Sequence, residues 1–203
     1  MTRTTRAAAL LAACLGLAAS LPARADAPVV RIRGTIASVE GNTVTIKPRV
    51  GDAVTVRLGD AVRVAGASAA KISDIQPDSY IGTAATPQAD GTLKALEVAV
   101  FAPSMRGTGD GHYPWDLEKE NTMTNGAVGA VTGTANRTIT VTYAGGQKTI
   151  TVPDDVPVVA LAPADAGLIK PGARVVAFTR ADASGTPVVD RMVVGQNGTV
   201  PPM

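Results

Sequence analysis

The chain carries one pattern of short β-type runs twice. Each half opens with a glycine followed by apolar residues in alternation, at residues 34–39 and again at 126–131. The later runs correspond in the same order: 42–46 with 137–141, 53–56 with 149–152, 75–78 with 169–172, and 90–98 with 184–194. Self-similarity of this kind indicates one structural unit encoded twice. We therefore expect two related units.

The repeated runs are rich in Val, Ile and Thr and alternate with a period of two. This alternation is typical of antiparallel strands with one apolar face and one solvent-facing face. Turn signals separate the runs, at residues 40–42, 51–52, 58–60, 89–91, 144–146 and 183–185. Short strands with such regular spacing predict a barrel or a sandwich.

Two further features narrow the fold. Alanine-rich segments at 67–75 and 162–169 run into Pro77 and Pro171, which indicates a short helical turn in each half. Aromatic residues make up only 3% of the chain, so the interiors must be filled by smaller side chains and stay narrow. We expect an all-β fold of two small OB-like β-barrels in tandem, each with one short helical turn. The expected boundaries are 26–101 for the first barrel, 102–125 for a connector, 126–195 for the second barrel and 196–203 for a polar tail.

The amino terminus has the features of a cleavable secretory signal peptide. Arg3 and Arg6 precede an apolar run at 7–21, and a small-residue cleavage signal follows. This predicts a periplasmic protein whose mature form begins at about Asp26. Removing residues 1–25 takes away three arginines and no acid, so the formal net charge falls from +2 to −1. The basic precursor is therefore no indication of nucleic-acid binding.

The only cysteine, Cys14, lies inside this apolar run. Residues 11–14 also resemble a lipobox, so a lipid anchor at Cys14 is an alternative. Continuation of the apolar run to Leu21 favours the simple signal peptide. Neither alternative leaves a disulfide within the chain. No later segment approaches the roughly twenty apolar residues of a spanning helix, so no membrane span is expected.

The rarest side chains gather in the connector. It holds the only histidine, His112, and the only tryptophan, Trp115. Tyr113 and Trp115 offer large apolar areas with polar tips, which suits residues that pin a loop between two barrels. With His112 and Asp116 they form the expected interaction surface.

A metal site in the connector is the alternative. His112, Met105 and Met123 supply one imidazole and two thioethers, a soft set that suits Cu(I). Asp110, His112 and Asp116 supply an O, N, O set for Zn(II) or Mn(II), although structural zinc usually takes four ligands. Asp110 and Asp116 are also conceivable calcium ligands, but the twelve-residue acidic loop is absent.

Catalysis and nucleic-acid binding have little support in the sequence. No Ser or Cys stands in a nucleophile-elbow context beside the lone histidine. The few other aromatic residues are scattered, whereas OB-type single-strand binders stack bases on exposed aromatic side chains. We therefore expect a protein that is not an enzyme and does not bind nucleic acid.

Three segments of the first half carry a family resemblance. They are G-x-I-x-x-V-x-G-x-x-V-T-I from Gly34, I-x-P-D-x-Y-I-G from Ile75 and D-G-T-x-x-A-x-E-V from Asp90. The pattern resembles a family of exported bacterial domains of unknown function, here in two copies, and the second half lacks the Ala-x-Glu-Val ending. Two-copy proteins of this type with a connector like residues 111–116 are sometimes labelled metal transporter permeases. A permease must cross the bilayer, so the resemblance implies at most a partner of a transporter.

The sequence thus predicts an exported, periplasmic, non-catalytic binding or envelope-associated module, whose partner is another envelope protein. A periplasmic protein that binds Cu(I) or another transition metal, or that assists a transporter, is the alternative.

Overall fold

The computed structural model describes residues 27–133 and 137–202, and these form an all-β protein. The expected signal peptide, with its expected cleavage site and Cys14, lies outside the described residues. Within the described part, no helix has the length and apolar character needed to cross a membrane.

The described residues contain twelve strands and three single turns of 3-10 helix. The strands are β1 (Val30–Glu40), β2 (Thr43–Pro48), β3 (Val54–Ala69), β4 (Tyr80–Pro87), β5 (Leu93–Phe101), β6 (Gly111–Pro114), β7 (Thr122–Thr132), β8 (Arg137–Tyr143), β9 (Gly146–Val152), β10 (Val158–Ala164), β11 (Arg174–Ala181) and β12 (Pro187–Gly195). The 3-10 turns are η1 (Ile72–Asp74), η2 (Pro103–Met105) and η3 (Ala166–Leu168).

One lobe is a small closed barrel of five strands. β1 pairs with β2 and β11, and β3 pairs with β2. β12 pairs with β11 and lies parallel to β3, which closes the circuit. The alternation of the sequence explains the barrel wall, because Val44 and Ile46 are fully buried while the alternating Thr43 and Thr45 are partly exposed. We call this the first lobe.

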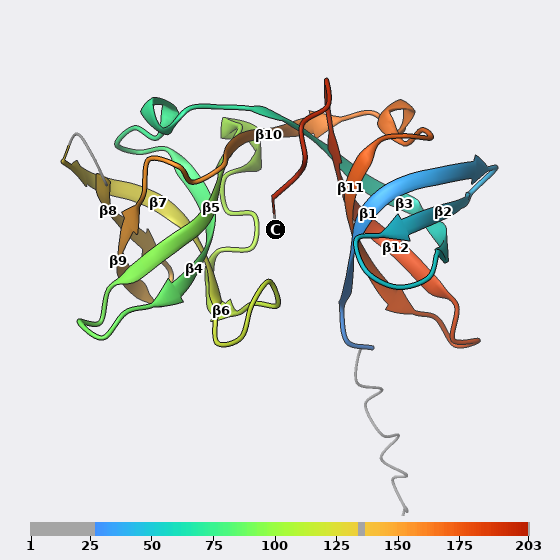
Figure 1. Cartoon of the computed structure of the whole chain (residues 1–203), viewed down its shortest axis with the longest axis horizontal. Coiled ribbons are helices and arrows are strands. Elements are labelled where there is room, and N and C mark those ends of the chain that lie inside the picture. Colours follow the sequence, from blue (N-terminus) through green and yellow to red (C-terminus); the bar gives the residue numbers. More distant parts are fainter. Residues whose placement is uncertain (1–26, 134–136, 203) are drawn as a thin grey trace, which may run out of the picture.

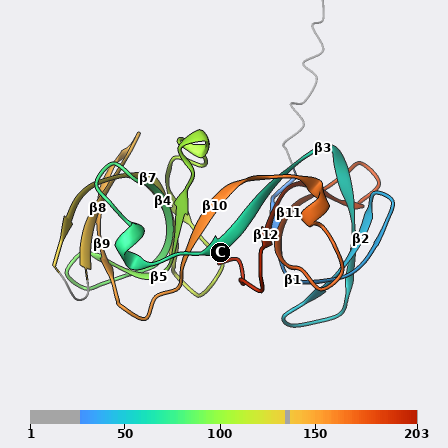
Figure 2. The same ribbon diagram turned by 90° about the horizontal axis from the view of Figure 1, so that it is seen from above.

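The second lobe contains β4, β5, β7, β8 and β9. β4 pairs with β5 and β7, and β8 pairs with β7 and β9. β5 meets β9 over two parallel residue pairs and β10 over four. β10 also forms an antiparallel ladder with β3, and this ladder joins the two lobes (Figures 1 and 2).

The strand pairing does not follow the expected tandem division. β1 to β3 come from residues 26–101, yet their barrel is completed by β11 and β12 from residues 126–195. β4 and β5 of the first half in turn pair with β7 to β9 of the second. Each half therefore contributes three strands to one lobe and two strands to the other, and a barrel made only of residues 26–101 does not form.

Corresponding hydrogen bonds occur in both lobes across this exchange. Ile36 donates to the Ala173 carbonyl and accepts from the Gly172 amide, whereas Val128 donates to the Ser79 carbonyl and accepts from the Asp78 amide. Gly172 and Asp78 both have positive φ, at 86° and 64°. Glycine adopts such a φ at little cost and Asp tolerates it better than most residues. The turn before β11 thus docks on β1, and the turn before β4 docks on β7.

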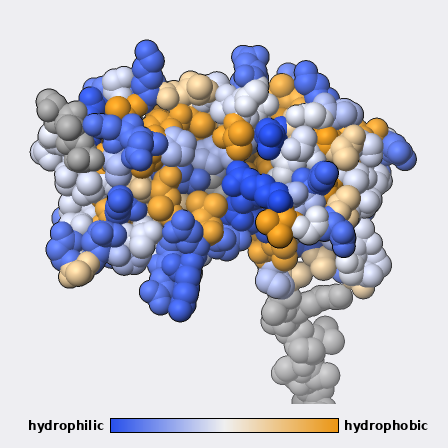
Figure 3. Space-filling model, in the orientation of Figure 1, coloured by the Kyte–Doolittle hydropathy of each residue, from blue (hydrophilic) through white to orange (hydrophobic). Residues whose placement is uncertain are grey.

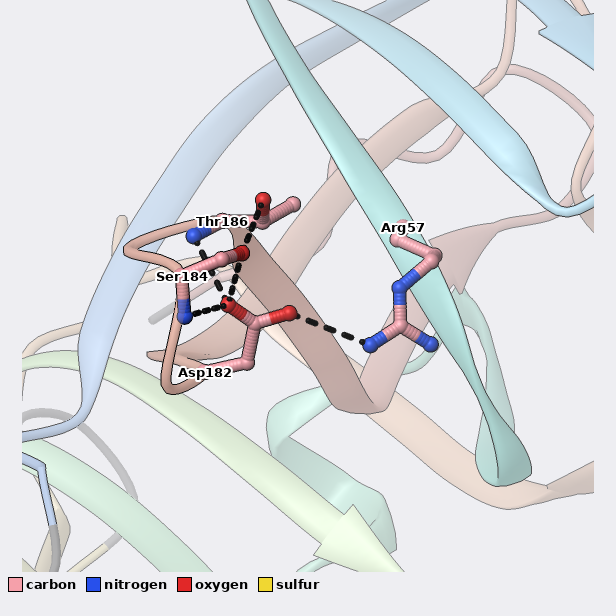
Figure 4. A network of polar contacts seen from close by, with 4 residues as sticks. All are labelled: Arg57, Asp182, Ser184 and Thr186. Atoms are coloured by element: carbon pink, nitrogen blue, oxygen red, sulfur yellow. Dashed lines mark hydrogen bonds and ion pairs between the residues drawn. The ribbon is translucent and has the colours of Figure 1, made fainter.

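A side-chain contact also joins a hairpin of the second half to a strand of the first half (Figure 4). In the turn between β11 and β12, the carboxylate of Asp182 accepts hydrogen bonds from the Ser184 amide, the Ser184 hydroxyl and the Thr186 amide. Its other oxygen lies 3.4 Å from Nη2 of Arg57 on β3. These bonds fix the turn that returns the chain into β12.

Several local expectations need correction. The expected turn at 58–60 lies inside β3, which runs without interruption for 16 residues and carries the chain from the first lobe towards the second. The two expected helical turns are shorter than the alanine-rich segments that suggested them. Residues 67–69 extend β3 and residues 162–164 end β10, so only η1 and η3 are helical. Pairing of β3 with β10 satisfies these backbone groups, which outweighs the helix preference of alanine.

Three apolar clusters hold the described chain together. One fills the first lobe and another fills the second. The third lies where the lobes meet and draws on both of them and on the connector. Its buried members are Ala65, Ala67, Tyr80, Ala84, Ala99, Phe101, Trp115, Met123, Val159, Leu161, Val176, Phe178 and Val193. We call this region the seam.

Candidate functional site

The connector leaves β5 and returns to β7, both strands of the second lobe, and runs along the seam between them. After η2 it turns through glycines into β6, which adds an edge strand to β7. The connector thus contains a short strand. β6 belongs to the second lobe, and the residues that directly follow it contact the first lobe.

Trp115 and Asp116 attach the connector to the first lobe. The guanidinium carbon of Arg31 lies 3.7 Å from the centroid of the Trp115 ring. Arg31 and Arg33 also lie 3.4 Å and 2.6 Å from the two oxygens of Asp116. Burial opposes ionisation of Asp116, but the bonds and charges of both arginines outweigh it and lower its pKa. A cation held over a buried indole and ion-paired to the next residue fixes this end of the connector.

Asp110 attaches the other end of the connector to the second lobe. Its carboxylate accepts hydrogen bonds from the Tyr80 hydroxyl at 3.2 Å and from the Ala144 amide at 2.8 Å. Burial, followed by the charge of Asp110, raises the pKa of Tyr80, which keeps that hydroxyl protonated as a donor. The two aspartates on either side of β6 therefore bind different lobes.

Tyr113 lies in the same seam. Its ring centroid is 6.0 Å from that of Trp115, and its hydroxyl accepts a hydrogen bond from Asn125 at 3.3 Å. Asn125 also donates to the Thr108 carbonyl at 3.1 Å, which ties the glycine-rich part of the connector to β7. Tyr113 and Trp115 thus both pack in the seam between the lobes.

His112 lies on the opposite face of β6. A hydrogen bond of 2.8 Å joins its Nδ1 to the Thr124 hydroxyl, and its ring stacks on Tyr143 with centroids 6.1 Å apart. Burial, and next the positive charge of Lys148, lower the pKa of His112. At neutral pH it is therefore an uncharged, hydrogen-bonded residue of the second lobe.

The candidate metal ligands are not brought to one point. The β6–β7 register sets His112 beside Thr124 and Tyr113 beside Met123. Successive strand residues point to opposite faces, so the imidazole and the Met123 thioether are separated by the ladder. Met105 lies with Met123 on the seam side. Among residues 27–133 and 137–202, no three His, Cys, Asp or Glu side chains are grouped so as to hold a metal ion.

A small cavity lies in the seam beside Trp115. It measures about 40 Å³, which suits ordered water and is too small for an organic ligand. Two buried polar atoms of its lining residues, Nε1 of Trp115 and Oδ1 of Asn125, have no hydrogen-bond partner in the described part of the chain. Buried polar atoms of this kind are uncommon in folded proteins and each calls for a partner. The other lining residues are Ala65, Phe101, Met105, Thr108, Tyr113, Met123, Leu161, Phe178, Arg191 and Val193.

A larger groove adjoins this cavity. It measures about 410 Å³, within the range of small-molecule sites. The two spaces share four lining residues, and the groove is bounded by Val62, Arg63, Val64, Ala65, Ser104, Met105, Thr108, Pro163, Ala164 and Arg191. On the face shown in Figure 3, strongly hydrophilic side chains lie next to apolar ones where the lobes meet.

Arg63 and Arg191 are the charged residues of this groove. Arg191 is half-buried, with its guanidinium carbon 3.8 Å from the Phe178 ring centroid. Burial is the main cause that lowers the pKa of Arg191, yet a guanidinium remains charged at neutral pH. Neither arginine stands out in the sequence, because each is isolated within a β-type run. One sequence feature could have identified them. In each run, the positions two residues before and after the arginine, which lie on the same face of the strand, hold no acidic residue.

Comparisons with protein-family models, with curated proteins and with solved structures found no match to this chain.

Proposed function

We propose that this protein is an exported, non-catalytic binding module with its binding site at the seam. In this proposal both lobes are OB-like barrels derived from one repeated unit, and the two copies exchange strands within the chain. The observation that carries it is the groove of about 410 Å³, which adjoins the seam cavity and contains two arginines. The exchange favours such a site, because β3 and β10 hold the groove walls in one ladder.

The chemistry of the groove favours binding over catalysis. Its lining residues include no carboxylate and no imidazole, and arginine does not exchange protons near neutral pH. General acid–base catalysis needs a group that titrates near the working pH. The one histidine lies on the other face of β6, where it bonds Thr124.

The periplasmic location rests on the sequence, where residues 1–25 have the features of a signal peptide. A binding module in that compartment would deliver its ligand to, or retain it at, another envelope protein.

A neutral, polarity-sensitive dye tests the site. Prodan should show enhanced, blue-shifted emission when mixed with the purified protein, since the groove is largely apolar. Ser104→Phe fills the groove from an exposed position and should abolish the enhancement. Gln147→Phe adds the same ring at an exposed position on β9 and should leave it unchanged. Equal enhancement in both variants, or none in the wild-type protein, would contradict the proposal.

A further inference from the structure

Arg63 and Arg191 are direct neighbours in the parallel ladder of β3 and β12. Like charges placed opposite each other across a ladder are destabilising. Within the described residues, neither guanidinium has a hydrogen bond or an ion pair with another side chain. The pair is therefore a local excess of positive charge.

The contrast with Arg31 and Arg33 is informative. These two are also neighbouring seam arginines of the first lobe, and both lie within 4 Å of the Asp116 carboxylate. The connector thus supplies a carboxylate for one arginine pair and none for the other. A ligand carboxylate between Arg63 and Arg191 would complete the same arrangement.

The remaining groove wall is mainly aliphatic. Val62, Ala65, Pro163 and Ala164 line it, and Met105 adds a flexible thioether chain. Methionine adapts its shape to apolar ligands. A ligand that satisfies this site needs an anionic head and an aliphatic body, and the volume restricts it to a small molecule.

Building on the proposed function, we propose that the groove binds a single-chain amphiphilic carboxylate. The carboxylate lies between the guanidinium groups of Arg63 and Arg191, whose planar donor forks suit bidentate pairing. The aliphatic chain lies along the wall formed by β3, β10 and η2. Partial burial of Arg191 strengthens the pairing, because charges interact more strongly away from bulk water.

Isothermal titration calorimetry with three probes tests this assignment. Decanoate should bind the purified protein, while acetate, which lacks the chain, and decanol, which lacks the charge, should bind at least about tenfold more weakly. Arg63→Gln and Arg191→Gln should each weaken decanoate binding about tenfold or more. Arg174→Gln, at an exposed position on β11 away from the groove, should not. Because Arg191 packs on Phe178, the exposed Arg63 provides the variant that leaves the packing intact.

The inference is overturned if decanol binds as tightly as decanoate, if both glutamine variants bind like the wild-type protein, or if decanoate does not bind at about 1 mM. If one of these outcomes is found while Prodan still binds and Ser104→Phe still blocks it, the groove remains a binding site but takes a different class of ligand. When Prodan also fails to bind, the proposed function fails as well.

Discussion

The guanidinium of Arg31 lies over the indole of Trp115, with 3.7 Å between its carbon and the ring centroid. Arg31 comes from β1, the first strand, and Trp115 is the connector residue directly after β6. Their contact holds the connector against the first lobe and forms one wall of the seam.

This contact predicts a measurable coupling. Trp115→Ala should lower the free energy of unfolding by about 3 kcal/mol, since it empties a nearly fully buried site. Arg31→Met should cost about 1 kcal/mol in the wild-type background and less when Trp115 is already absent. Urea unfolding of both single variants and the double variant measures the coupling. Strictly additive costs would show that the stacking contributes nothing to stability.

The Asp182 turn predicts a stability difference that disappears in acid. Hydrogen bonds from Ser184 are the leading cause that lowers the pKa of Asp182 from 3.8 to about 2. A lowered carboxylate pKa contributes stability above the unfolded value of 3.8, and this is lost as the pH falls through about 2. Asp182→Asn should therefore lower the Tm by roughly 2–4 °C at pH 7 and by almost nothing at pH 2.

Thermal unfolding at both pH values, followed by circular dichroism, measures this difference. Asp155→Asn changes an exposed acid of the 153–157 turn whose carboxylate makes no hydrogen bond within the described residues, and it serves as the control. An undiminished Tm difference at pH 2 would mean that Asp182 acts through shape and not through charge.

His112 predicts a loss of stability in the same direction, but at a higher pH. Its folded pKa lies below the ordinary 6.5 because of burial and then Lys148. The unfolded chain therefore takes up this proton first as the pH falls, so stability is complete above 6.5 and decreases below it. Between pH 7.5 and 5.5, the loss of unfolding free energy should be smaller in His112→Gln than in the wild-type protein. Equal losses in the two proteins, measured in urea, would refute this assignment.

Much of the local structure follows from the sequence, because strands and turns are encoded by neighbouring residues. Alternation of Thr and Ile or Val gives β2 and β8 their buried and exposed faces. The partners of these strands could not be deduced in the same way. Both halves carry the same pattern, so the sequence suits β11 and β12 as partners for the free edge of β1 as well as it suits β4 and β5.

In the candidate site, too, some features follow from the local sequence and others depend on strand pairing. Tyr113 and Trp115 were proposed to pin the connector between two barrels because they combine large apolar areas with polar tips, and both pack at the seam. Grouping His112 with Met105 and Met123 from their sequence proximity overlooked β6, whose pleat directs neighbouring side chains to opposite faces. Arg63 and Arg191 are 128 positions apart and meet only through the strand exchange, which sequence spacing alone does not reveal.

The exchange itself predicts how fragments behave. A fragment of residues 27–101 retains β1 to β5 but lacks β11 and β12, which complete the first lobe. A fragment of residues 102–202 lacks β4 and β5, which complete the second. Neither fragment alone should form a cooperatively unfolding monomer, whereas an equimolar mixture should recover the strand content and the cooperative transition of the whole chain. Circular dichroism and size-exclusion chromatography measure this recovery. Independent folding of the first fragment as a stable monomer would show that its strands can close a barrel without the second half, and would argue for the tandem arrangement.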